Sequence, residues 1–272
     1  MTVHTFCNNK FRLDDPHVVD PRAGSPWSAI ERAKLSRVIA DGFAEPLDFP
    51  PIPQAVLKED KIAIAVEPDT PCGLEIARLV AARFVEQGNA RENITILCVD
   101  KTLDKHADFV VHDPTDSEHM AYLLADQDGV PCYVNRVLFD ADIVVPIGTG
   151  DGGRRVNSLC SAFCDQETQN HLERMKPDRA RALERQVDNN LGVFWQVRLV
   201  TAPGDQVLRV MVGSSESVLE KSGEFGTEVW NLNIERPADL IVATIESHCS
   251  QTWSHLRQAI LNADKVATDE AV

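Results

Sequence analysis

KIAIAV (residues 61–66) and ITILCV (residues 94–99) decide the fold, because both are short, apolar, β-prone runs of the kind found in strands buried on both faces. Residues 74–87 between them place their apolar side chains on one helical face, and Gly88 follows as a C-terminal stop. A strand, a helix and a second strand within about forty residues form a βαβ unit, which predicts a parallel sheet.

The same reading extends along the chain. We expect further strands at residues 109–111, 142–147, 191–200, 206–212 and 239–244, and helices at 29–42, 176–190, 214–221 and 253–263. This predicts an α/β, parallel-sheet, Rossmann-like domain with helices on both faces and the start of a second α/β domain at the C-terminus. We divide the chain into an extended lead-in (1–60), an N-terminal α/β domain (61–190) and a third part (191–272) that holds the remaining strands and an incomplete second domain.

Composition excludes several classes of protein. The 272 residues carry 27 Lys and Arg against 42 Asp and Glu, a formal charge of −15 that argues against nucleic-acid binding. No apolar run reaches the ~18 residues of a membrane-spanning helix, and residues 1–10 lack the apolar core of an export signal. The seven cysteines have no metal-knuckle spacing, so we expect reduced thiols in a cytoplasmic protein. Cys160 and Cys164, one helical turn apart, are interpreted as core thiols or, alternatively, as metal ligands.

The most conspicuous motif is GTGDGGRR (residues 148–155), directly after a predicted strand and before a helical pattern. Its glycines allow backbone N–H groups to approach an anion, and Arg154 and Arg155 can bind phosphate or carboxylate oxygens. The alternative is a glycine-rich turn with two exposed arginines. The motif formally matches G-x-G-x-x-G, but no strand ending in an acidic residue follows about 20 residues later, which disfavours a nicotinamide or flavin site.

Two further residues are candidates for a site. Glu67 ends the first predicted strand, and ligands of open parallel sheets gather at the carboxyl ends of strands. We therefore expect Glu67, Lys101 and the glycine-rich loop near one another. His171 follows Arg155 by 16 residues and is interpreted either as a surface or hydrogen-bonded histidine or as a metal ligand.

Four stretches resemble, in order and spacing, the N-terminal domain of the nickel-dependent lactate racemase family. They are KIAIAV with the turn EPDTP (residues 61–71), GVPCYVNR followed by ADI (residues 129–143), Gly152-Gly153-Arg154-Arg155, and Asn170-His171. The similarity extends over residues 46–272.

The resemblance implies a nickel-pincer nucleotide, a pyridinium mononucleotide that holds nickel, and proton-coupled hydride transfer at the 2-carbon of a hydroxy acid. His171 would then ligate nickel. The cofactor would be bound by Glu67, Thr70, Gly152, Gly153, Arg154 and Arg155. Thr70 stands where the family has an arginine, and Arg155 stands at its cofactor-linking lysine. His106 is the nearby histidine available as the catalytic proton carrier.

The sequence thus predicts a 2-hydroxy-acid racemase or epimerase with nickel and the pincer nucleotide as cofactors. The alternative is a catalytically degenerate relative that acts as an anion- or nucleotide-binding module, and a third hypothesis is an unrelated nucleotide-dependent oxidoreductase. The expected partners are a small anionic substrate or a nucleotide and further copies of the chain, without nucleic acid or membrane.

Overall fold

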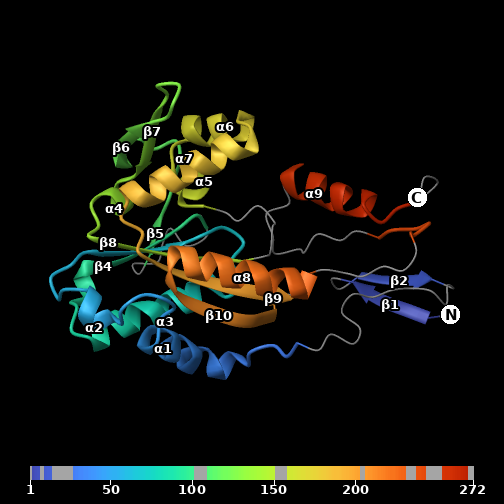
Figure 1. Ribbon diagram of the computed structural model, residues 1–272, viewed down its shortest axis with the longest axis horizontal. Helices are drawn as coiled ribbons and strands as arrows, with labels where there is room; N and C mark the ends of the chain where they lie inside the picture. The colour runs from blue at the N-terminus through green and yellow to red at the C-terminus, as the bar shows by residue number, and fades with distance from the viewer. Residues whose placement is uncertain are drawn as a thin grey trace.

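The computed structural model shows a central sheet with helices on both sides (Figure 1). It describes residues 2–6, 9–13, 27–100, 109–150, 158–202, 206–230, 237–242 and 253–268. The strands are β1 (Thr2–Phe6), β2 (Asn9–Leu13), β3 (Ile62–Val66), β4 (Ile94–Cys98), β5 (Phe109–Val111), β6 (Met120–Ala125), β7 (Pro131–Asn135), β8 (Ile143–Thr149), β9 (Trp195–Ala202) and β10 (Gln206–Ser214). The helices are α1 (Leu35–Ala44), α2 (Ile52–Ala55), α3 (Gly73–Glu86), α4 (Arg136–Phe139), α5 (Leu159–Phe163), α6 (Gln166–Arg174), α7 (Pro177–Asn190), α8 (Ser215–Trp230) and α9 (Trp253–Asp264), with short 3-10 turns at Arg32–Lys34, Arg91–Asn93 and Ser117–His119.

Six strands form the main sheet of the described chain, in the order β10-β9-β8-β3-β4-β5. Strands β5, β4, β3, β8 and β9 are parallel to one another, and only the edge strand β10 runs antiparallel to its neighbour β9. The chain moves from β3 outward to β4 and β5 and then returns to β8 on the other side of β3. The strand order therefore reverses between β3 and β8, and in open α/β sheets this is the position where ligands bind. The predicted α/β fold is confirmed.

Both faces of the sheet are buried, because alternate side chains of each strand point to opposite sides. Ile62, Ile64 and Val66 of β3 pack in a core cluster that includes residues of α1 and α3. Ala63 and Ala65 belong to a second cluster, which includes residues of α5 and α7. In Figure 1, α1 and α3 lie below the sheet and α4 to α7 above it, which agrees with the predicted helices on both faces.

Residues 27–60, expected as part of an extended lead-in, contain α1 and contribute to the first core cluster. The Phe43 ring of α1 contacts Phe84 of α3 and Trp195 of β9, with ring centroids 5.9 Å and 5.4 Å apart. Leu47 then forms a bridge with Gly213 of β10. The boundaries at residues 60 and 190 remain predictions, while the described packing joins elements from all three parts in one core.

Two segments differ from expectation. The hairpin β6–β7 was not expected, and its strands pair antiparallel outside the main sheet. The prediction of a strand at residues 239–244 is wrong for the four positions that the structure describes, because residues 239–242 form no strand. They follow Ala238, which forms a bridge with Ala267 after α9. Within the described ranges, no helix combines the length and the apolar character needed to cross a membrane.

Candidate functional site

Three neighbouring strands place charged and small residues at the point where the strand order reverses. The backbone N–H of Glu67, just after β3, donates to the carbonyl of Ile147 in β8, with N and O 2.9 Å apart. The next residue, Gly148, pairs in register with Arg198 of β9. Glu67 and Arg198 therefore flank Gly148 on the face of the sheet opposite the first core cluster.

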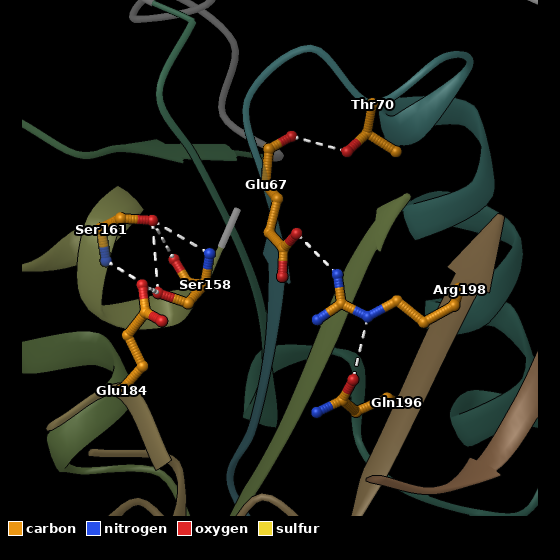
Figure 2. Close-up of polar contacts among 7 residues, drawn as sticks. All are labelled: Glu67, Thr70, Ser158, Ser161, Glu184, Gln196 and Arg198. Atoms are coloured by element: carbon orange, nitrogen blue, oxygen red, sulfur yellow. Dashed lines mark hydrogen bonds and ion pairs between the residues drawn. The ribbon is translucent and has the colours of Figure 1, made fainter. Parts of the chain in front are cut away.

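Glu67 and Arg198 form a buried ion pair across this strand. Glu67 Oε2 lies 2.6 Å from Arg198 Nη1, and the two side chains are 1% and 4% exposed. Arg198 Nε also donates to Oε1 of Gln196, 2.9 Å away, which fixes the plane of the guanidinium (Figure 2). Ion pairs without solvent depend on such additional hydrogen bonds, because both charges have lost their water.

Gly148 is required for this contact. A Cβ added at Gly148 would overlap the carboxylate of Glu67 and the guanidinium of Arg198. The first glycine of the sequence motif therefore has a packing role that is visible in the structure. Gly150 is similarly close to α8, since a Cβ there would overlap the hydroxyl of Ser222.

Helix α7 contributes two more carboxylates, Glu184 and Asp188, which lie one helical turn apart. Ser158 caps α5 in a reciprocal arrangement with Ser161, and its Oγ donates to Glu184 Oε1, 2.9 Å away. In Figure 2, Glu67 lies in the middle. Ser158 and Glu184 are on its left, and Arg198 is on its right. Both α7 carboxylates are within electrostatic reach of Glu67.

Burial changes the protonation of this cluster, which consists of Glu67, Glu184, Asp188 and Arg198. Loss of solvent raises the pKa of Glu67, and the charge and hydrogen bond of Arg198 oppose this rise. Loss of solvent also raises the pKa of Asp188 to about 7, with Arg198 opposing and the neighbouring carboxylates Glu67 and Glu184 reinforcing the rise. Asp188 can therefore bind or release a proton near neutral pH, as a general acid or base must.

Two carboxylate oxygens of the cluster remain available as acceptors. Glu67 Oε1 and Asp188 Oδ1 are buried and have no hydrogen-bond partner among the residues that the structure describes. A buried acceptor without a donor costs about 1–3 kcal/mol. A ligand hydroxyl or amine at this edge of the sheet would remove that cost.

Of the predicted catalytic, cofactor-binding and metal-ligating residues, the structure describes Glu67, Thr70 and His171. Glu67 lies at the expected end of β3. Thr70 donates from Oγ1 to the carbonyl of Glu67, 2.8 Å away, and so closes the turn between β3 and α3 (Figure 2). The guanidinium beside Glu67 comes from Arg198 instead. Six other candidates lie outside the described residues, namely Lys101, His106, Gly152, Gly153, Arg154 and Arg155.

His171 lies on α6 and contacts the β6–β7 hairpin. Its Nε2 is 2.7 Å from Oδ2 of Asp126, which follows β6, and the imidazole side chain is 29% exposed. This bond leaves Nδ1 for another partner. A histidine that ligates a metal usually donates its other ring N–H to a carboxylate in this manner.

Several residues of the site were missed in the sequence. The helix predicted at residues 176–190 is confirmed as α7, but its carboxylates Glu184 and Asp188 were not predicted as site residues. Arg198 was also missed, although its sequence context contained a signal. Gln196 and Arg198 alternate with apolar residues in a strand that is buried on both faces, and a charged side chain there requires a buried partner.

Comparisons with known proteins give matches to solved structures alone. No protein-family model and no curated protein sequence matches the chain. The fold is similar to the solved structure of the lactate racemase apoprotein from Thermoanaerobacterium thermosaccharolyticum, with a TM-score of 0.61 and 15% sequence identity. The match covers 88% of this chain and 64% of the racemase chain. At this identity the likeness shows a related fold.

Proposed function

We propose that the chain is a lactate racemase-like protein that binds a small hydroxylated anion, a 2-hydroxy acid or a nucleotide, at the carboxyl edge of its sheet. The observation that carries this proposal is Glu67 Oε1, a buried acceptor at the reversal of strand order without a described donor. A ligand hydroxyl would donate to it. Residues 151–157, which include Arg154 and Arg155, would hold the anionic group.

Binding can be tested with two kinds of probe, the enantiomers of lactate and a pyridine mononucleotide. We expect at least one of them to raise the melting temperature of the wild-type protein, and Glu67→Gln to weaken that ligand by about tenfold through loss of a charged acceptor. Glu59→Gln changes an exposed glutamate and should bind as the wild type does. Absence of any shift, or equal affinity in the Glu67 variant, contradicts the proposal.

A second candidate function is racemisation or epimerisation of a 2-hydroxy acid, and the Asp126–His171 pair favours it. When bound, a nickel-pincer nucleotide would supply a hydride acceptor for the 2-carbon of the substrate. The donor chemistry of the chain fits this group in two respects. The carboxylate of Asp126 orients the imidazole of His171 with Nδ1 left for a metal, and Glu67 Oε1 is an acceptor suited to a sugar hydroxyl.

In this second candidate, the residues of the chain would divide into binding and proton-handling groups. Gly152, Gly153, Arg154 and Arg155 would hold the phosphate, while Glu67 and Thr70 would form the adjoining edge. Proton transfer would fall to His106, as the family resemblance implies, or to Asp188. Asp188 has a pKa near 7 and can therefore exchange a proton at neutral pH.

Production of the chain together with the cofactor-making enzymes tests this candidate. We expect bound nickel, conversion of one lactate enantiomer into the other, and loss of the metal in His171→Ala. His119→Ala is a matched control, because His119 makes the same kind of contact with Asp116, Nδ1 to Oδ2 at 2.8 Å, on an exposed turn. A nickel-free protein, or equal nickel content in the two variants, contradicts the candidate while leaving the ligand-binding proposal open to its own test.

A further inference from the structure

Three cysteines from two separate segments meet in the second core cluster. Cys132 lies in β7, Cys160 in α5, and Cys164 directly after α5. The Sγ of Cys164 is 3.6 Å from that of Cys132 and 3.5 Å from that of Cys160. All three sulfur atoms lie within 4.8 Å of one another, and each residue is at most 1% exposed.

These spacings suit sulfur ligands of one metal ion. With metal–sulfur bonds of about 2.3 Å, two sulfurs on the same ion lie roughly 3.8–4.0 Å apart. The observed separations of 3.5 Å and 3.6 Å need only a small expansion to reach that range. Cys160 and Cys164 are one helical turn apart, and β7 supplies the third sulfur that the sequence alone did not reveal.

The hydrogen bonds among the thiols favour one thiolate. Hydrogen bonds from Cys160 and Cys164 lower the pKa of Cys132 to about 4, while its burial opposes that shift. Burial and donation to its neighbours raise the pKa of Cys164, and donation to Cys132 raises that of Cys160.

The surroundings offer three sulfur donors and, among the described residues, no fourth sulfur, imidazole or carboxylate ligand. His112 is close to Cys164, but its Nε2 is 3.1 Å from the Cys164 carbonyl oxygen and its Nδ1 is 3.1 Å from Nδ2 of Asn135. Both ring nitrogens are therefore engaged. Structural zinc almost always takes four ligands, whereas soft sulfur donors also select Cu(I).

We propose that Cys132, Cys160 and Cys164 form a buried three-sulfur site for one monovalent thiophilic metal ion of the Cu(I) type. Three soft sulfur donors, with no fourth sulfur, imidazole or carboxylate among the described residues, suit Cu(I) better than structural zinc, which almost always takes four ligands. A thiol that ligates as a thiolate releases its proton to solvent. The ion would join the β6–β7 hairpin to the α5–α6 segment, which already meet at the Val134–Cys164 bridge.

The test is an anaerobic titration with Cu(I) against a chromophoric Cu(I) chelator. The background protein carries three substitutions, Cys7→Ala, Cys72→Ala and Cys249→Ala. It retains Cys98 of β4 and the three cysteines of the cluster, so no other thiol can bind the ion. We expect one ion per chain in this background and an affinity at least about tenfold lower after Cys160→Ala or Cys160→Ser. Cys98→Ala is the matched control, because Cys98 is equally buried, at 2% exposure, but lies in the other core cluster.

The outcomes separate clearly. No binding in the background protein, or unchanged binding after both Cys160 substitutions, overturns the site. Tighter binding of Zn(II) than of Cu(I) overturns the monovalent assignment. A Cu X-ray absorption spectrum of the loaded wild-type protein gives the ligand count without any variant. Three sulfur neighbours support the proposal, and nitrogen or oxygen neighbours contradict it.

Discussion

Glu67 and Arg198 contact each other across a strand that separates them. Their strands, β3 and β9, each pair with β8 and not with one another, yet Oε2 and Nη1 are 2.6 Å apart. The contact exists because the intervening residue, Gly148, has no side chain on that face. A glycine, a carboxylate and a guanidinium in three adjacent strands are therefore one structural unit at the carboxyl edge of the sheet.

The first prediction concerns this glycine. Gly148→Ala places a methyl group between Glu67 and Arg198, so either the strands shift or the ion pair breaks. We expect the free energy of unfolding to fall by about 3 kcal/mol or more in urea denaturation. Gly223→Ala is the control, because the space around a Cβ in the middle of α8 is open, and alanine there should stabilise the helix by up to about 1 kcal/mol. Equal stability of the Gly148 variant and the wild type would contradict the steric argument.

A double-mutant cycle on Glu67 and Arg198 gives the second prediction. Arg198→Met leaves a buried carboxylate unpaired and should cost about 3–5 kcal/mol, whereas Glu67→Leu combined with Arg198→Met should cost less than the sum of the single changes. Urea unfolding at constant pH measures each corner of the cycle.

The control cycle uses Arg32 and Glu75, an ion pair of the same length, 2.6 Å, whose side chains are 74% and 33% exposed. Water screens that pair, so its coupling should stay below about 1 kcal/mol. Similar coupling energies in the two cycles would show that burial does not govern the Glu67–Arg198 pair.

Asp188 gives a pH-dependent prediction. Its pKa is about 7 in the fold and near the ordinary 3.8 in the unfolded chain, so between these values the folded state holds the extra proton. The stability of the wild type should therefore fall, relative to Asp188→Asn, as the pH rises from 4 to 7. Thermal melts over this range measure the difference. Asp140→Asn removes an exposed carboxylate and should show the same pH dependence of stability as the wild type. If Asp188→Asn also shows that pH dependence, the shifted pKa of Asp188 is contradicted.

The sheet could be predicted because strands buried on both faces are continuously apolar. β3, β4 and β8 have this pattern, and they carry the parallel core. The β6–β7 hairpin was missed although Asp128-Gly129 between two β-prone runs is a recognised hairpin signal.

The site was predicted in part, because sequence places Glu67 at a strand end but does not show which distant residues approach it. Arg198 is 131 positions away, and its proximity depends on the position of β9 beside β8. Glu184 and Asp188 lie on a strongly charged helix, where periodicity alone does not distinguish a solvated carboxylate from a buried one. The roles assigned from resemblance to His106, His171 and the glycine-rich loop stay predictions.

His112 provides the last prediction. Burial lowers its pKa, while the Cys164 carbonyl opposes this shift, so the folded protein prefers the neutral imidazole. Its Nε2–H donates to the Cys164 carbonyl, which leaves Nδ1 to accept from Asn135 Nδ2. Below the ordinary pKa of about 6.5 the unfolded chain gains a proton that the folded protein resists. The free energy of unfolding should therefore decrease as the pH is lowered, by at most about 1.4 kcal/mol per pH unit.

His112→Gln removes this titration, and urea unfolding from pH 7.5 to 5 should show a smaller loss of stability in the variant than in the wild type. His119→Gln changes a histidine whose side chain is 72% exposed and should retain the wild-type slope. Protonation of His112 would break the hydrogen bond that its Nδ1 accepts from Asn135. Because His112 also contacts the Cys164 carbonyl, this change would occur next to the cysteine cluster. If His119 rather than His112 carries the acid sensitivity, the neutral buried imidazole is contradicted.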